Sequence, residues 1–253
     1  MKSMSGEHRM NTPEGKRLLA ALRGADYAHA GEETAIELAL AEWPKNSRRR
    51  ILDAGCGRGG TAHFLRTHGW GLVTGVDRDS DSIDHAREKY PEVTFATADL
   101  TDARSLPDGP FDGITMFNVL YAISDQAAAL KALRTVAAPG AQLMIFDYTG
   151  TGGYEKAVAS LHPEFALWHP PIMAKMSATL QAAGWDLVTT HSLNREYERW
   201  YADLVSRFTT RQTALASVAD EATIAYAKGF YANLLHLIRE GALGGAIFHA
   251  EAA

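Results

Sequence analysis

The chain has 253 residues, of which 46% are hydrophobic and 22% charged, and its formal net charge is -5 at pH 7. These values are typical of a globular protein and exclude a wholly disordered or fibrous chain. An acidic balance without a basic face also argues against a nucleic-acid partner. The single cysteine, Cys56, excludes an internal disulfide framework and a cysteine-based zinc cluster.

The first thirty residues lack the apolar core of a signal peptide. No apolar run approaches the roughly 20 residues that a membrane helix needs. Together with the lone cysteine, these features predict a cytoplasmic protein with no membrane partner. We expect a monomer or a homodimer that binds no metal.

The N-terminal part of the chain, residues 1–45, is predicted to form a helical cap, with its clearest amphipathic segment at 31–43. In the next part, 46–148, apolar runs of strand length alternate with segments of helical period. The expected strands are 50–55, 71–77, 93–99, 111–118 and 141–148. The expected helices between them are 61–69, 80–90 and 125–138.

The C-terminal part, 149–253, begins with a stretch rich in glycine, proline and aromatic residues (149–172), which predicts a long loop or lid. A helix, a strand (185–192), two long helices and a last strand (245–252) follow. Strands alternating with helices favour right-handed crossovers and a sheet covered on both faces. We therefore predict one α/β domain over 1–253: a doubly wound, Rossmann-like, mostly parallel seven-stranded sheet with an antiparallel last strand, an N-terminal helical cap and C-terminal helical additions.

A glycine turn follows the first predicted strand, in "ILDAGCGRGG" (51–60). Gly55, Gly57 and Gly60 match the G-x-G-x-x-G pattern of dinucleotide-binding turns, where the backbone turns sharply and approaches its ligand closely. In dinucleotide enzymes a pyrophosphate lies there, against a helix N-terminus. The carboxylate of Asp53 directly before the turn suits a cation better than a pyrophosphate. S-adenosylmethionine carries such a cation, an α-ammonium beside a sulfonium.

The turn also resembles motif I of class I S-adenosylmethionine-dependent methyltransferases, an acidic residue followed by G-x-G-x-G. The matching residues are Asp53, Gly55, Gly57 and Gly59. Asp77 ends the second strand, where this family bridges the ribose hydroxyls, and Asp99 ends the third, where it meets the adenine amino group. Residues 111–123 and 138–148 look like the family's fourth- and fifth-strand motifs. The resemblance implies S-adenosylmethionine as cofactor, bound by Tyr27, Asp53, Gly55, Cys56, Gly57, Gly59, Asp77, Arg78, Asp99, Leu100 and Asn118.

Within that family, the chain resembles the small-amine branch typified by phosphoethanolamine methyltransferases. Tyr27 precedes Gly31 and Glu33 much as in that branch, where a tyrosine closes over the methionine end of the cofactor. Two positions depart from the branch: Asn118 stands where it usually has an acidic residue, and Ala122 where it has a histidine that pairs with a tyrosine in catalysis. These departures argue against phosphoethanolamine itself as the substrate.

Several aromatic residues are candidates for the substrate side. Tyr197, Trp200, Tyr201 and Leu204 share one helical face, which suits either the core or an aromatic wall attracting a cationic substrate. Tyr154 and Trp168 could complete a lid. We expect His29 and His191 to be ordinary hydrogen-bonded or surface residues. The predicted catalytic residues are Tyr27, Tyr121 and Tyr148. The predicted substrate-binding residues are Asn118, Tyr121, Asp147, Tyr148, Trp200 and Tyr201.

These features predict methyl transfer from S-adenosylmethionine to a small molecule. No histidine–acid pair stands at a motif position, which favours a polar amine over an unactivated alcohol, because a neutral amine needs no general base. Methylation at oxygen or carbon of a small aromatic, acid, quinone-like or polyketide-like substrate is the alternative within the class. Outside it stand an NAD-binding oxidoreductase and a non-catalytic S-adenosylmethionine-binding protein.

Overall fold

The computed structural model describes residues 10, 12–159, 161 and 163–253. Residues 1–9 and 11 of the predicted cap therefore lie outside the described part. The rest of the cap contains α1 (Pro13–Arg23) and α2 (Glu32–Ala39). Helix α1 begins where the Thr12 hydroxyl accepts a hydrogen bond from the Gly15 amide, and it ends at Gly24 in the left-handed conformation.

Within the described residues, seven strands form one sheet in the order β3-β2-β1-β4-β5-β7-β6. The strands are β1 (Arg50–Ala54), β2 (Leu72–Asp77), β3 (Thr94–Thr97), β4 (Phe111–Phe117), β5 (Ala137–Gly150), β6 (Trp185–Ser192) and β7 (Leu243–Ala252). The first five run parallel to one another, and β7 lies antiparallel between β5 and β6. The predicted doubly wound, mostly parallel sheet with an antiparallel last strand is confirmed.

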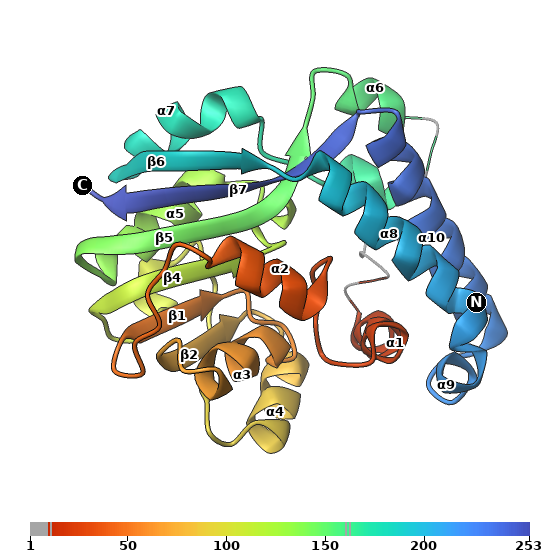
Figure 1. The fold of residues 1–253 in the computed structure, drawn as a ribbon, viewed down its shortest axis with the longest axis horizontal. Coiled ribbons are helices and arrows are strands. Elements are labelled where there is room, and N and C mark those ends of the chain that lie inside the picture. The colour runs from red at the N-terminus through yellow and green to blue at the C-terminus, as the bar shows by residue number, and fades with distance from the viewer. Residues whose placement is uncertain (1–9, 11, 160, 162) are drawn as a thin grey trace.

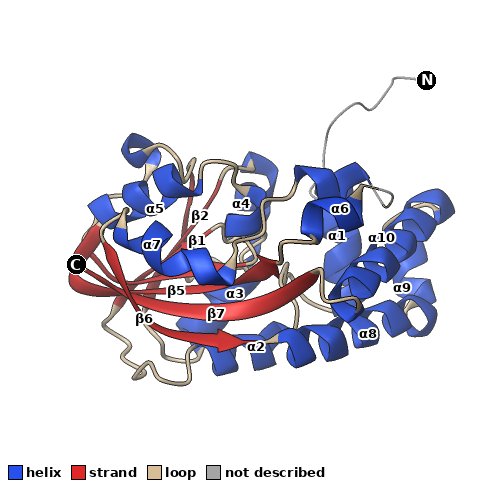
Figure 2. Ribbon diagram, turned by 90° about the horizontal axis from the view of Figure 1, so that it is seen from above, coloured by secondary structure: helices blue, strands red, loops and turns tan. Residues whose placement is uncertain are grey.

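Helices cover both faces of this sheet (Figure 2). The helices that follow α2 in the described part are α3 (Gly60–Thr67), α4 (Ser80–Lys89), α5 (Gln126–Thr135), α6 (Tyr154–Val158), α7 (Met176–Gln181), α8 (Asn194–Thr210), α9 (Gln212–Ala216) and α10 (Glu221–Arg239). Of these, α8, α9 and α10 lie mainly beyond the carboxyl ends of the strands. Short 3-10 turns occur at η2 (Ala103–Ser105), η3 (Leu120–Ala122), η4 (Pro163–Leu167) and η5 (Met173–Lys175). None of the helices in the described part is both long and apolar enough to span a bilayer.

Successive side chains along each strand point to opposite faces of the sheet, so the hydrophobic core has two parts, one on each face. Ile51 packs into a core shared with the first four helices, whereas Leu52, the next residue of β1, packs into a core with α5 and α7. Met144 and Leu143 of β5 divide in the same way. Strands that are apolar on both faces read as continuous hydrophobic runs, which is why the parallel sheet could be predicted.

The predicted loop over 149–172 is in part regular structure. Strand β5 continues to Gly150, and α6 and η4 follow within the stretch. The extension of β5 forms because β7 pairs with it as far as Leu243 opposite Gly150. Composition alone predicted a loop there, and tertiary pairing overrides that preference.

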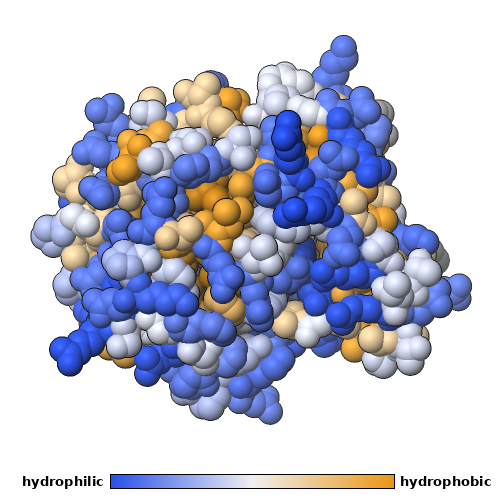
Figure 3. Space-filling model, in the orientation of Figure 1, coloured by the Kyte–Doolittle hydropathy of each residue, from blue (hydrophilic) through white to orange (hydrophobic). Residues whose placement is uncertain are grey.

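The carboxyl ends of the parallel strands face a group of helices formed by α1, α8, α9 and α10 (Figure 1). Helix α1 contacts all three of α8, α9 and α10, so helices from the N-terminal and C-terminal parts of the chain pack together over this edge of the sheet. In the orientation of Figure 1, apolar side chains gather near the middle of the molecular surface, and hydrophilic ones cover most of the remainder (Figure 3).

Candidate active site

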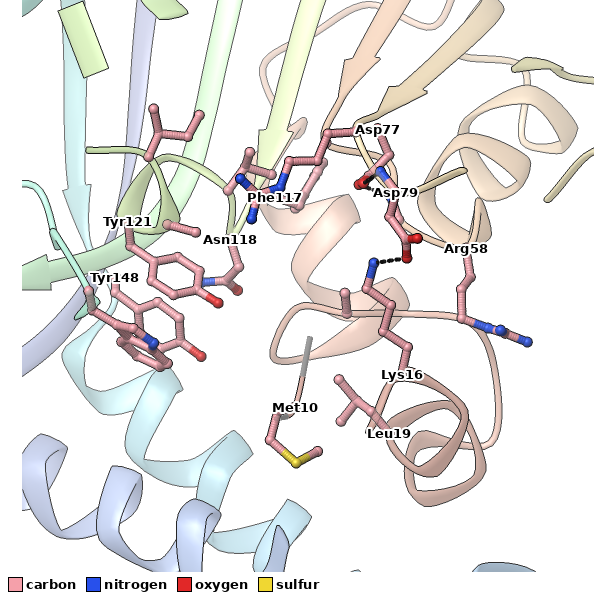
Figure 4. A pocket seen from close by; sticks show the side chains of 18 of the residues that line it. Met10, Lys16, Leu19, Arg58, Asp77, Asp79, Phe117, Asn118, Tyr121 and Tyr148 are labelled. Atoms are coloured by element: carbon pink, nitrogen blue, oxygen red, sulfur yellow. Dashed lines mark hydrogen bonds and ion pairs between the residues drawn. The ribbon is translucent and has the colours of Figure 1, made fainter. Parts of the chain in front are cut away.

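A cavity of about 460 Å³ opens at the carboxyl ends of the strands. The strand order reverses between β1 and β4, the point at which ligands bind in open α/β sheets. Segments that follow β1, β2, β3 and β4 line one side of the cavity. Helix α1 and the C-terminal helices supply the other side, with Met10 and Leu19 facing the strand ends (Figure 4).

The glycine turn after β1 forms one wall. Gly57 has a φ of 53°, and a Cβ there would meet nothing within 4 Å, so the turn stands open toward the cavity. Its amide donates to Asp77 Oδ2 at 2.9 Å. Gly55 also lines the cavity. At Gly57 the sequence therefore places bare backbone where a ligand can approach closely, whereas a Cβ at Gly55 would lie 2.4 Å from Val119, so that glycine lets the turn pack against Val119.

Two carboxylates lie beyond the turn. Asp77 ends β2, and its Oδ1 accepts from the Asp79 amide at 3.0 Å. Asp99 follows β3, and its Oδ1 accepts from the amide and hydroxyl of Thr101 at 2.8 and 2.7 Å. The Thr101 hydrogen bonds lower the pKa of Asp99, which keeps it an acceptor. Such oxygens suit ligand groups that donate, as ribose hydroxyls and the adenine amino group do. Arg78 and Leu100 line the same end.

Asn118 stands where β4 ends, at the middle of the cavity. Its backbone has a φ of 54°, a strained conformation for a residue other than glycine. Its Nδ2 donates to the Tyr197 hydroxyl at 3.1 Å, whereas its buried Oδ1 has no partner among the described residues. A buried acceptor left unpaired costs about 1–3 kcal/mol. The α-ammonium of S-adenosylmethionine would donate to this oxygen, so the residues present fit that cofactor.

The far end of the cavity is aromatic. The rings lining it belong to Tyr121, Tyr148, Trp168, Tyr201, Phe230 and Tyr231. The Tyr148 and Tyr201 hydroxyls form a short hydrogen bond with each other. Burial raises the pKa of Tyr201 to about 12 and holds those of Tyr121 and Tyr148 well above their ordinary value. At neutral pH these side chains therefore act as neutral hydrogen-bonding phenols rather than phenolates.

Tyr27 lies at the cavity wall between α1 and α2. Its hydroxyl donates to Glu33 Oε1 at 3.1 Å, so the two residues quoted for the resemblance do contact each other. His29, two residues further, is buried and bonded to the Ala30 carbonyl and the Thr61 hydroxyl, and burial lowers its pKa to about 4. His29 therefore does not serve as a base at the cavity, in agreement with its expected ordinary role.

Asp53 does not reach the cavity. Its side chain is 1% exposed, its Oδ1 accepts from the Thr115 hydroxyl at 3.0 Å, and its Oδ2 has no partner among the described residues. Cys56 is buried beside it, and Gly59 is a packing position, because a Cβ there would lie 2.8 Å from Phe95. None of these three residues lines the cavity. They were predicted to contact the cofactor, and in the structure they instead pack under the turn and support it.

Asp147 is also buried rather than facing a substrate. Its Oδ2 accepts from the amides of Val119, Leu120 and Tyr121 at 3.1, 2.6 and 3.3 Å, and its Oδ1 from the Tyr148 amide at 2.7 Å. This carboxylate fixes the turn that carries Asn118 and Tyr121. Asp147 is therefore corrected from a substrate-binding residue to one that supports the turn.

The aromatic face of α8 divides between core and cavity. Tyr201 lines the cavity, but Trp200 packs over Gly31, where a Cβ would lie 2.6 Å from the indole. Tyr197 is buried; its hydroxyl accepts from Asn118 Nδ2, and its ring packs edge-on against that of Tyr148 with 5.5 Å between centroids. Trp200 is therefore corrected from a substrate contact to a packing residue. Trp168 does reach the cavity, whereas the Tyr154 hydroxyl donates to the Phe165 carbonyl at 2.7 Å.

Several lining residues were missed by sequence reasoning. Lys16 of α1 reaches Asp79 at 2.5 Å (Figure 4), and Arg58 reaches Asp26 at 2.8 Å. Glu164 of η4 and Phe230 and Tyr231 of α10 line the aromatic end. Arg58 lies within the glycine turn itself. No local pattern marks the others, because they meet the strand ends only after the cap and the C-terminal helices fold over the sheet.

We predict that Asp53→Asn stabilises the ligand-free protein mainly at high pH. Burial, with a smaller contribution from the nearby charge of Asp77, raises the pKa of Asp53 to about 7. An acid with a raised pKa in the folded state loses stability as pH rises through that pKa. The Tm difference between variant and wild type should therefore be larger at about pH 8.5 than at about pH 5.5. An equal Tm difference at both pH values would contradict this prediction. Asp186→Ala, at an exposed position of β6, is the control.

The fold and site define a Rossmann-like protein whose cavity, at the carboxyl ends of the strands, has one end lined by carboxylates and an adjoining aromatic end. Residues 27–203 match the family model described as "Methyltransferase domain". The chain therefore belongs to the methyltransferase domain family. Among the described residues, no group of three or more histidine, cysteine or acidic side chains could hold a metal ion.

Curated relatives and solved structures agree with this family. A demethylmenaquinone methyltransferase of Thermus thermophilus is 35% identical over 119 residues, which cover 45% of this chain and 52% of that protein. A phosphoethanolamine N-methyltransferase of Triticum aestivum is 28% identical over 109 residues, covering 42% of this chain and 21% of that protein. The matched region thus spans about half or less of these relatives.

Among solved structures, Haemonchus contortus phosphoethanolamine N-methyltransferase 2, in complex with phosphomonomethylethanolamine and S-adenosylhomocysteine, superposes with a TM-score of 0.82. It is 16% identical, and the match covers 96% of this chain and 58% of that one. At this identity the likeness shows the fold, including the C-terminal helices, rather than the substrate.

Proposed function

We propose that this protein transfers a methyl group from S-adenosylmethionine to a small molecule, with a polar amine as the preferred acceptor. The observation that carries the proposal is one continuous cavity. The cavity begins at the carboxylates of Asp77 and Asp99, which can accept hydrogen bonds from a ligand. It passes the unpartnered Oδ1 of Asn118 and ends in an aromatic chamber. A protein that only senses the cofactor needs no chamber beyond the reactive methyl.

The residues have separate roles in this proposal. Asp77 and Asp99 would hold the ribose and adenine, Gly57 would let the backbone approach, and Asn118 would bind the α-ammonium. When bound, the cofactor supplies an electrophilic methyl on a positively charged sulfur. The chain's task is then to align acceptor, methyl and sulfur and to exclude water, which lowers the entropic cost of the displacement.

Apart from the Glu164 carboxylate, the described lining of the aromatic chamber offers no side chain suited to deprotonate an acceptor, which supports an amine. Its tyrosines are poor bases, because burial raises the pKa of Tyr121 and of Tyr148 well above the ordinary value. His29 and His191 are not placed to act as bases either. His29 is enclosed elsewhere in the core, and His191 lies on β6, half exposed and 3.9 Å from Glu42. A neutral amine attacks through its own lone pair and requires no such base.

The test is methyl transfer from methyl-labelled S-adenosylmethionine to three matched panels of amines, phenols and carboxylic acids, with the label and S-adenosylhomocysteine both measured. We expect turnover with amines and stoichiometric formation of S-adenosylhomocysteine. Turnover confined to phenols or acids would move the acceptor to oxygen, and binding of NAD in place of S-adenosylmethionine would remove the proposal.

Tyr148→Phe is expected to lower turnover about 10-fold or more while leaving cofactor affinity within about twofold, because it removes only one hydroxyl from the chamber wall. The Tyr148 hydroxyl bonds to that of Tyr201 beside the acceptor position and lies away from the nucleoside end. Single-turnover kinetics with a saturating acceptor, together with calorimetric cofactor titration, measures both effects. Wild-type kinetics would leave Tyr148 a packing residue. Tyr154→Phe, at a hydroxyl bonded outside the cavity, is the control.

A further inference from the structure

Tyr197 of α8 is buried next to the cavity without being part of its lining. Its ring packs against those of Phe146 and Tyr148, with 5.4 and 5.5 Å between centroids. Gly245 of β7 leaves room for this ring, because a Cβ there would lie 2.3 Å from it. Packing on several sides therefore fixes the ring, and its hydroxyl meets the side chain of Asn118.

The backbone of Asn118 is fixed independently of Tyr197. Its amide donates to the Phe146 carbonyl at 2.8 Å, and the three amides that follow it donate to Asp147. Figure 4 shows the Asn118 side chain extending from the end of β4 into the cavity. The backbone thus decides where the side-chain amide lies. It does not decide which end of that amide faces a ligand, because the last torsion of asparagine is broad and roughly two-fold.

The two ends of the Asn118 amide have opposite hydrogen-bonding character, since the oxygen accepts and the nitrogen donates. In the structure Nδ2 donates to the Tyr197 hydroxyl at 3.1 Å, and the buried Oδ1 has no partner among the described residues. After a half-turn of the amide, an ammonium group in the cavity would meet N–H donors and find no acceptor there. The contact with Tyr197 therefore bears on which kind of ligand group Asn118 can bind.

We propose that Tyr197 is a positioning residue that holds the Asn118 oxygen toward the cavity and thereby makes this part of the site selective for an ammonium group. The inference rests on the proposed use of S-adenosylmethionine and assigns a further residue to the recognition of its α-ammonium. Tyr197 acts only through Asn118, because it does not line the cavity. Asn118→Asp would remove the need for the contact, since both terminal atoms of a carboxylate are oxygens.

Calorimetric titration with four ligands tests this inference: S-adenosylhomocysteine, its decarboxylated analogue, its deaminated analogue, and methylthioadenosine, which lacks both groups. Only the first two carry the ammonium. We expect Tyr197→Phe to weaken these two by about fivefold and to leave the others within about twofold. Asn118→Ala should give the same pattern with a loss of about 10-fold or more. Tyr154→Phe, which removes a buried hydroxyl bonded to the Phe165 carbonyl, is the matched control and should preserve all four affinities.

A double variant separates positioning from general support of the cavity. In the Asn118→Asp background, adding Tyr197→Phe should change the affinity for every ligand by less than about twofold, because a carboxylate presents an oxygen to the cavity in either orientation. If Tyr197 only supported the packing around the cavity, loss of its hydroxyl would weaken all four ligands in both backgrounds.

The inference would be overturned if Tyr197→Phe weakened all four ligands equally or none of them. It would also be overturned if Asn118→Ala weakened only the ligands that carry a carboxylate, because the amide would then present its nitrogen to the cavity. That second result does not depend on the folding of the Tyr197 variant. Either result, together with tight binding of S-adenosylhomocysteine by the wild type, would leave the proposed methyl transfer standing. A wild-type protein that bound none of the four ligands would overturn both.

Discussion

Asp77→Ala is expected to weaken S-adenosylmethionine binding by about 100-fold or more, the largest functional effect of any single change considered. A paired, charge-assisted hydrogen bond to a ligand contributes about 1.5–3 kcal/mol, and the proposed ribose contact uses two hydroxyls on one carboxylate. The substitution also removes the acceptor for the Gly57 amide, at 2.9 Å, and so loosens the turn that faces the ligand. Both losses act on the same site.

Calorimetric titration of Asp77→Ala and Asp77→Asn measures this effect. The asparagine variant keeps an oxygen for one partner and should lie between alanine and wild type. Asp84→Ala is a matched control, because that carboxylate is exposed on neighbouring α4. If Asp77→Ala bound the cofactor as tightly as the wild type, Asp77 would have no place in the ribose site.

Asp147→Ala should have the largest effect on stability. Removing this buried carboxylate leaves four backbone amides without their acceptor: those of Val119, Leu120, Tyr121 and Tyr148. Each unsatisfied buried group costs about 1–3 kcal/mol, less what water entering the vacated space restores. We expect a total loss of about 3–5 kcal/mol, which for a domain of this size lowers the Tm by about 10 °C.

The readouts are thermal unfolding and cofactor affinity measured together. Asp147 fixes the turn that carries Asn118. Affinity for S-adenosylmethionine, measured well below the temperature of unfolding, should therefore fall as well. Asp186→Ala on the exposed edge strand should change neither quantity. An Asp147→Ala protein that melts within about 2 °C of the wild type would show that the four hydrogen bonds are replaced at little cost.

The fold could be predicted because its strands and helices carry their own periodic signals. Doubly buried parallel strands read as continuous apolar runs, and their order along the chain defines crossovers of one hand. The cofactor end could be predicted in part for a related reason. Asp77 ends β2, Asn118 directly follows β4, and Asp99 lies two residues after β3, so the sheet itself brings them together. The helical cap and the last antiparallel strand were also confirmed.

The rest of the site depends on rotations and contacts that local sequence does not specify. Trp200 and Tyr201 are neighbours on α8, yet one covers Gly31 and the other lines the cavity, because consecutive helical residues differ by about 100° in direction. For Asp53 and Asp147, which lie on strands, the sequence likewise did not specify which way the side chain points. Asp53 lies one residue before the end of β1 and Asp147 three residues before the end of β5. Both side chains turn into the protein interior, where Asp53 accepts a hydrogen bond from the Thr115 hydroxyl and Asp147 accepts from backbone amides.

We expect the open glycine turn and the carboxylates after β2 and β3 to bind S-adenosylmethionine. Isothermal titration of the purified protein with S-adenosylmethionine, S-adenosylhomocysteine and NAD tests it most directly. We predict saturable one-to-one binding of the first two, with micromolar or tighter affinity, and none of NAD. Binding of NAD with no response to either sulfur-containing ligand would contradict the account, because the site would then hold a pyrophosphate.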